Sequence, residues 1–134
     1  MRQLANFNLL LAFFIILWGA WVRLSGSGAG CGDHWPLCNG EVIPLDPGVK
    51  TLTEYIHRFS SGIFGITVLW AWIISFKTKV KSFSWSFFWT LFFTISEALI
   101  GAFLVKKGLV VDNDSMMRAI VISPHLVNTL FLIY

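Results

Sequence analysis

The stretch FNLLLAFFIILWGAWV, residues 7–22, decides the fold class because it carries no charged side chain. Comparable, mostly apolar stretches follow at about 52–76, 83–105 and 116–134. A helix needs about 20 apolar residues to cross a bilayer, and in lipid its backbone polar groups must be satisfied within the segment. Alternation with a period of two is absent, so helices are favoured over barrel strands. We therefore predict an all-α integral membrane protein, a bundle of four transmembrane helices.

The composition supports this prediction. Of the 134 residues, 56% are hydrophobic and 13% are charged, against roughly 25% charged residues in soluble domains. The length predicts one membrane domain, residues 1–134, with lipid as its surroundings and no nucleic-acid partner. Trp18 and Trp21 stand where a signal peptidase would need small residues, so we expect the first segment to remain as a span.

The loop between the first two segments, residues 24–50, contains both cysteines, Cys31 and Cys38. Such a pair is a candidate disulfide if the loop faces an oxidising compartment. A structural zinc site would need four ligands, and this loop adds only His34 to the two thiols. The preceding Gly/Ser-rich run, residues 25–30, predicts a tight loop and lacks the Lys-Ser/Thr of a phosphate-binding loop.

Positive charges alone do not settle the orientation. Arg2 and the lysines at 77, 79 and 81 indicate a cytoplasmic side, but Lys106, Lys107 and Arg118 lie on the other side. The cysteine pair decides between the two orientations. We predict that the N-terminus is inside and the cysteine loop outside.

Two histidines fall inside predicted spans, on helices that start from the same side. His57 lies roughly 8 Å and His125 roughly 14 Å into its segment, at 1.5 Å per residue. Two imidazoles at similar depth could hold one metal ion or haem iron between them. Alternatively, each histidine hydrogen-bonds a neighbouring helix. Ser61 and Gly65 follow His57 on the same face and leave space, either for a flat ligand or for close helix packing.

Glu54 precedes His57 by three residues and shares its helix face. A carboxylate at the membrane edge is costly without a role or a partner. Glu54 could orient the imidazole, accept a proton or pair with Arg58, and Arg58 could instead bind a haem propionate. Glu97, in the third span, receives no role from the sequence, and we expect His34 to be solvated or locally hydrogen-bonded.

These residues carry a recognisable pattern. GAGCGDHWPLCNG at 28–40, EYIHR at 54–58 and His125-Leu126 resemble the haem A synthase family. The resemblance implies a multi-pass enzyme of the cell membrane that oxidises the methyl group of haem O to the formyl group of haem A for cytochrome oxidase biogenesis.

The resemblance also assigns roles. It implies that His57 and His125 bind haem iron, that Glu54 is catalytic, and that Cys31 and Cys38 form an external disulfide. Haem b is the expected cofactor, haem O the substrate, and a haem O synthase a candidate partner.

The chain departs from the family in its length. Family members have eight spans in two halves, so we expect this chain to be the N-terminal half, which would need its C-terminal half or a second copy. His34 is a smaller departure, inserted before Trp35. Two alternatives stay open: a b-type cytochrome, which needs the histidines but not Glu54, and a thiol/quinone oxidoreductase, which normally has a C-x-x-C motif and a second cysteine pair, both absent here.

Overall fold

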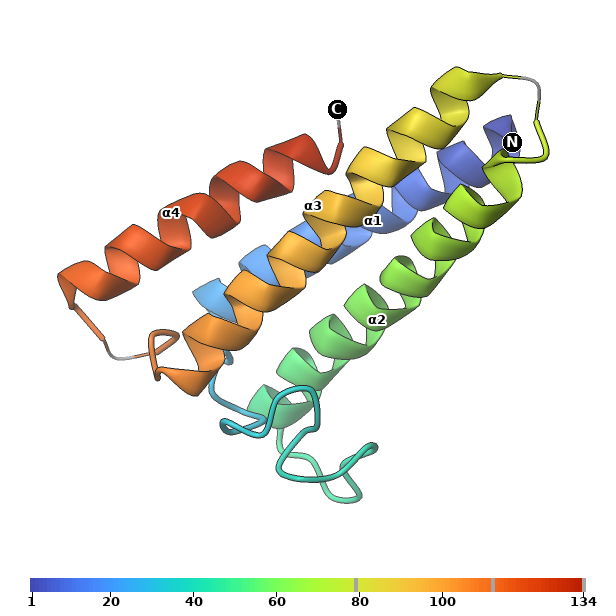
Figure 1. The fold of residues 1–134 in the computed structure, drawn as a ribbon. Coiled ribbons are helices and arrows are strands. Elements are labelled where there is room, and N and C mark those ends of the chain that lie inside the picture. The colour runs from blue at the N-terminus through green and yellow to red at the C-terminus, as the bar shows by residue number, and fades with distance from the viewer. Residues whose placement is uncertain (79, 112, 134) are drawn as a thin grey trace.

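Helices form the fold in the computed structural model, which describes all residues except 79, 112 and 134 (Figure 1). Within the described residues, Cys38 and Glu41 form an isolated β-bridge and no strand occurs, so the all-α prediction is confirmed. The helices are α1 (Arg2–Leu24), α2 (Val49–Ser75), α3 (Lys81–Lys106) and α4 (Met116–Phe131).

The observed helices differ in length from the predicted spans. α1 begins five residues before the predicted start at 7, and α2 begins at Val49 instead of 52, because hydropathy marks only the apolar part of a helix whose hydrogen bonds continue through polar residues. The earlier start of α2 places His57 eight residues, roughly 12 Å, from the helix end. His125 lies nine residues, roughly 14 Å, into α4. The two histidines are therefore closer in depth than the sequence predicted.

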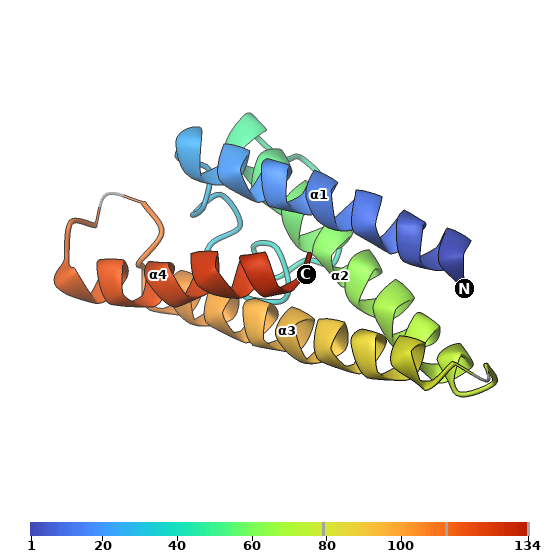
Figure 2. The ribbon, with the colours of Figure 1, turned by 90° about the horizontal axis from the view of Figure 1, so that it is seen from above.

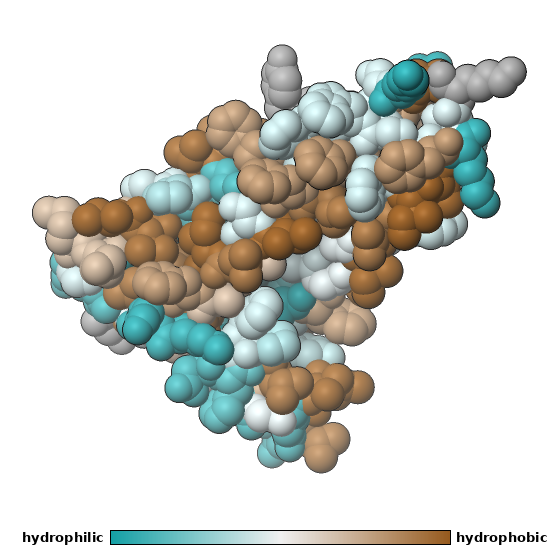
Figure 3. All heavy atoms as spheres, in the orientation of Figure 1, coloured by the Kyte–Doolittle hydropathy of each residue, from teal (hydrophilic) through white to brown (hydrophobic). Residues whose placement is uncertain are grey.

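By length and composition, α1, α2 and α3 could each cross a membrane. α4 has 16 residues and contains Pro124, so it is roughly 24 Å long, against a hydrocarbon core of about 30 Å. The predicted fourth span, 116–134, continues past the helix end at Phe131 and includes residue 134, which lies outside the described residues. Figure 3 shows hydrophobic residues along the helices and hydrophilic residues gathered near the loops. The large apolar side chains that α1 and α3 expose include Leu10, Leu17, Trp85 and Leu99.

Helices that follow one another in the chain pack side by side: α1 on α2, α2 on α3 and α3 on α4. Figure 2 shows α4 running beside α3 and α1 beside α2. A small buried cluster joins α1 to α2, with Leu132 and Ile133 from the end of the chain packed against it. Its buried members are Ala12, Phe64 and Val68.

Polar bonds reinforce the contact between α1 and α2. The Trp18 indole N–H donates to the backbone oxygen of Thr53 at 2.9 Å, and the Thr67 hydroxyl lies 2.9 Å from Asn8 Oδ1. Asn8 is buried, so this bond satisfies a polar group that would otherwise be costly in an apolar interior.

Candidate functional site

The cysteine loop is closed by a disulfide between Cys31 and Cys38, as predicted, so its thiols are not zinc ligands. Both cysteines are almost completely buried, which does not suit the exposed, exchanging pair of a thiol oxidase. Asn39 and Gly40 turn the chain with positive φ angles. The loop is therefore an ordered cap.

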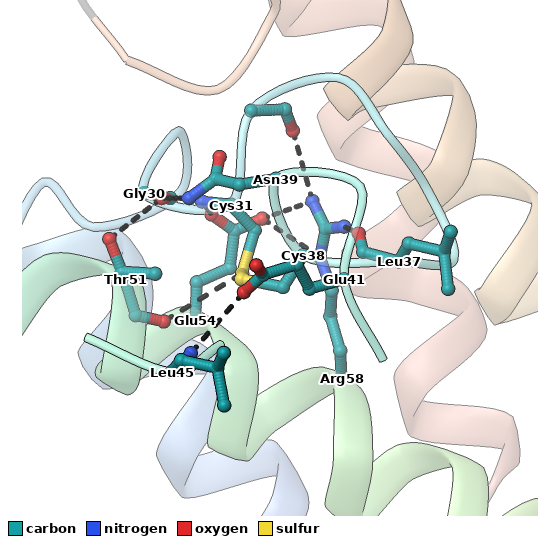
Figure 4. The surroundings of a disulfide bond; sticks show 11 residues. Gly30, Cys31, Leu37, Cys38, Asn39, Glu41, Leu45, Thr51, Glu54 and Arg58 are labelled. Atoms are coloured by element: carbon teal, nitrogen blue, oxygen red, sulfur yellow. Dashed lines mark hydrogen bonds and ion pairs between the residues drawn. A yellow bond between two sulfur atoms is a disulfide. The ribbon is translucent and has the colours of Figure 1, made fainter. Parts of the chain in front are cut away.

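A buried ion pair ties this cap to α2 (Figure 4). Glu54 Oε1 accepts hydrogen bonds from Arg58 Nη2 at 2.6 Å and Nε at 3.0 Å, and Glu54 Oε2 accepts from the Cys31 amide at 2.8 Å. Arg58 also donates to the backbone oxygens of Leu37 and Gly32. The side chains of Glu54 and Arg58 are only 4% and 10% exposed. Of the roles that the sequence left open, the structure shows the pairing of Glu54 with Arg58.

Gly30 makes the closest approach between the cap and α2. A Cβ atom at this position would lie 2.5 Å from the backbone oxygen of Lys50 and 2.7 Å from the amide nitrogen of Thr51. The Thr51 hydroxyl donates to the Gly30 oxygen at 2.9 Å. Sequence reasoning treated this glycine as part of a turn and missed its packing role, because the contact joins residues about twenty positions apart.

His57 projects from α2 onto α1. A Cβ atom on Gly19 would lie 2.8 Å from Cε1 and 3.2 Å from Nε2 of the His57 ring, so the ring occupies the space that the glycine leaves. The Ser61 hydroxyl donates to the His57 backbone oxygen at 2.7 Å. Gly65 lies against Thr94 of α3, so this glycine serves helix packing, one of the two uses left open.

His125 projects from α4 onto α3, where a Cβ atom on Gly101 would lie 3.6 Å from its Cε1. His125 Nδ1 lies 3.1 Å from Glu97 Oε1, although the ring is not oriented for a hydrogen bond. Glu97 also accepts from Asn128 Nδ2 at 2.7 Å and lies 2.6 Å from the Thr129 hydroxyl. Sequence reasoning assigned no partner to Glu97 because all three of these residues lie on another helix, α4.

The two histidines lie on different helices, and each ring rests on a glycine of a neighbouring helix, His57 on Gly19 of α1 and His125 on Gly101 of α3. Nδ1 of each ring is buried and has no hydrogen-bond partner within the part of the chain that the structure describes.

This donor set fits a haem iron. An imidazole nitrogen without a hydrogen bond to protein is available as an iron ligand, and both rings are only partly exposed. Across the described ranges, no cluster of three or more His, Cys, Asp or Glu side chains suits a metal ion.

Arg58 and His34 make their polar contacts elsewhere than with the rings of His57 and His125. Arg58 makes its hydrogen bonds to Glu54 and the cap, and its binding to a haem propionate stays a prediction. His34 is exposed and lies 3.4 Å from Asp33, which agrees with its predicted local contact.

Fold and site together define a helical membrane protein with paired histidines and a disulfide-capped carboxylate. The chain belongs to the family described as COX15-CtaA, cytochrome oxidase assembly protein, whose model matches residues 2–134. The predicted family is thereby confirmed.

Curated relatives agree with this membership. The chain is 36% identical to a Heme A synthase of Exiguobacterium sibiricum over 110 residues, 75% of this chain and 36% of that protein. It is 38% identical to a Heme A synthase of Bacillus cereus over 80% of this chain and 35% of that protein. It is also 46% identical to a Protoheme IX farnesyltransferase of Thermus thermophilus over 93% of this chain and 21% of that protein. The chain thus spans little more than a third, or less, of these relatives. No solved structure gives a significant match.

Proposed function

We propose that this chain forms the haem-binding unit of a haem A synthase, which oxidises the methyl group of haem O to the formyl group of haem A for cytochrome oxidase biogenesis. The observation that carries the proposal is that α2 and α4 each present a histidine ring that rests on a glycine of a neighbouring helix, His57 on Gly19 and His125 on Gly101. The relatives named Heme A synthase supply the reaction class.

In this proposal, His57 and His125 hold haem iron through their ring nitrogens, and Arg58 can offer a remaining N–H to a propionate. When bound, haem supplies the redox chemistry, with haem O as substrate and a resident haem b as electron-transfer cofactor. The protein's part is therefore to bind and orient the macrocycle and to manage protons.

Glu54 is the proposed catalytic carboxylate. Converting a methyl group to a formyl group with oxygen from water replaces two C–H bonds by a C=O bond and releases four protons and four electrons, and an electron acceptor outside this chain takes the electrons. A carboxylate one helix turn from His57 can accept those protons. Its bonds to Arg58 and the Cys31 amide hold it in place for that role.

We further propose a complete topology in the cell membrane. α4, extended by the residues after it, forms the fourth span of one membrane domain, with the N-terminus inside and the cysteine loop outside. The matched relatives are longer, so the unit works with a second helical unit, either the rest of a longer chain or another copy. The Thermus relative supports a link to haem O synthase, because a segment similar to this chain lies within a protein named for farnesyl transfer to protohaem.

The test is haem extraction and chromatography from membranes of cells that supply haem O. The protein with its natural flanking sequence is compared with His57→Ala and Glu54→Ala. His34→Ala and Glu41→Ala are matched controls, because both residues are exposed in the cap.

We expect formyl-haem from the wild type and from both controls, and its loss in the two site variants while the protein remains inserted. Retained haem b without formyl-haem from the wild type would identify an electron carrier and reject the synthase. Formyl-haem formation by Glu54→Ala would remove Glu54 from the chemistry.

A further inference from the structure

A polar cluster links the middle of α3 to α4 beside one proposed iron ligand. It consists of Glu97, His125, Asn128 and Thr129. Asn128 Nδ2 donates to Glu97 Oε2 at 2.7 Å and to the Phe93 backbone oxygen at 2.9 Å. A carboxyl group at this depth is costly in lipid unless partners satisfy it. The cluster therefore needs an explanation beyond chance placement.

The geometry points to Glu97 as a positioning residue for His125, fixing the imidazole so that Nδ1–H faces the carboxylate and Nε2 is left to bind iron. Glu97 Oε1 lies 3.1 Å from His125 Nδ1, within hydrogen-bond distance. Only the ring orientation departs from a hydrogen bond, and the final torsion of a histidine is broad. A rotation about this torsion that points Nδ1–H at Oε1 would complete the bond.

The neighbours of Glu97 favour this role. Asn128 and Thr129 approach its two carboxyl oxygens separately, which fixes the plane of the carboxyl group and directs Oε1 toward the histidine. Gly101 leaves room for the His125 ring, because a Cβ atom on this glycine would lie 3.6 Å from His125 Cε1. A carboxylate that accepts a hydrogen bond from a metal-ligating imidazole fixes the tautomer of the imidazole and makes it a stronger ligand.

His57 is held differently. Its ring rests on Gly19, and its buried Nδ1 has no hydrogen-bond partner in the described part of the chain. The two proposed ligands are therefore held differently, because among the described residues only the His125 ring has a carboxyl group behind it. This inference rests on the proposed function only in taking His125 as an iron ligand.

The first test needs no variant and no haem. Nitrogen-15 NMR of histidine-labelled, haem-free protein in lipid reports which ring nitrogen carries the proton. We expect His125 in the Nδ1–H form, and His125→Gln assigns its signal. A predominantly Nε2–H form of neutral His125 overturns the inference.

The second test uses haem b as the probe, with spectroelectrochemical titration of the reconstituted wild type, Glu97→Gln and Thr129→Val. Removing the negative charge behind the ligand disfavours ferric iron, so we expect Glu97→Gln to raise the midpoint potential. A tenfold change in the ratio of oxidised to reduced haem corresponds to about 59 mV. Thr129→Val breaks the same link between α3 and α4 but keeps the charge, so its potential should stay near the wild type.

The outcomes separate this inference from the proposed function. Equal potentials for wild type and Glu97→Gln, with normal haem spectra, overturn the positioning role alone. A raised potential in Glu97→Gln without any formyl-haem from the wild type supports the positioning role and rejects the synthase. A haem spectrum unchanged by His125→Ala overturns both.

Discussion

At the scale of the residue, the His57 ring can lie against α1 only because Gly19 has no side chain. We expect Gly19→Ala to displace the His57 ring, because the new Cβ would lie 2.8 Å from Cε1. Overpacking of this kind costs about 1–3 kcal/mol. The measurement is the Soret spectrum and haem content of the purified variant, which should fall below those of the wild type.

The control for Gly19→Ala is Gly62→Ala on α2. A Cβ at Gly62 meets nothing within 4 Å, and alanine favours a helix over glycine by about 0.5–1 kcal/mol. Its haem content should match the wild type. Equal haem content in Gly19→Ala would show that the ring position does not matter.

Gly30 gives a sharper prediction, because its neighbours are backbone atoms that cannot rotate away. A Cβ atom would lie 2.5 Å from the Lys50 oxygen, so Gly30→Ala should separate the cap from α2, at a cost of about 1–3 kcal/mol. Limited proteolysis of the cap measures the effect. Gly48→Ala, in the same loop with open space around it, should be cleaved at the wild-type rate, and equal rates for both variants would contradict the prediction.

At the scale of the element, the join between the cap and α2 depends on the buried pair of Glu54 and Arg58. Glu54→Gln keeps the shape but leaves the Arg58 charge, 10% exposed, without its counter-ion. Breaking a buried pair costs about 3–5 kcal/mol. We expect a lower thermal midpoint and faster cleavage of the cap.

Glu41→Gln is the matched change for Glu54→Gln, because Glu41 is exposed and accepts one bond, from the Leu45 amide at 3.3 Å. Its effect should stay within about 0.5 kcal/mol. Equal stability of the two variants would mean that the buried pair contributes little.

The disulfide is the other constraint on the cap. Cys31 and Cys38 are separated by seven positions, and closing so short a loop stabilises by roughly 2–3 kcal/mol in the chain-entropy model. The double Cys→Ser variant should therefore be cleaved faster within residues 31–38 under equal protease. Unchanged cleavage would show that the hydrogen bonds of Arg58 hold the cap without the disulfide.

The sequence predicted the helices well and their contacts only in part. Continuous apolar runs located all four helices. The start of α2 and the end of α4 differ from the predicted bounds, because polar residues continue α2 toward its N-terminus and α4 ends before the apolar run does. Glu54 and Arg58 lie four residues apart on one helix, so their pairing was among the predicted alternatives.

The contacts that the sequence did not predict are long-range. Glu97 meets His125 only because α3 packs on α4, and Gly19 meets His57 because α1 packs on α2. No periodicity within one helix reveals such a partner. The available signal was the cost of a carboxylate inside a span, which demands a polar neighbour on another helix.

At the scale of the whole molecule, the orientation proposed above makes a prediction of its own. A membrane-impermeant maleimide should label an Asp46→Cys variant in sealed cells, because Asp46 is exposed in the loop and that loop faces outward in the proposed orientation. A reporter fused to the N-terminus should resist external protease in the same cells. Labelling only after the cells are opened would reverse the topology.

The disulfide that closes the cap has a consequence for biogenesis. In the orientation proposed above, the bridge between Cys31 and Cys38 can form only after the loop has crossed the bilayer and met an oxidising environment. Translocation of the loop therefore precedes its oxidation, and a chain retained on the inner side keeps both cysteines as free thiols in an unbridged cap.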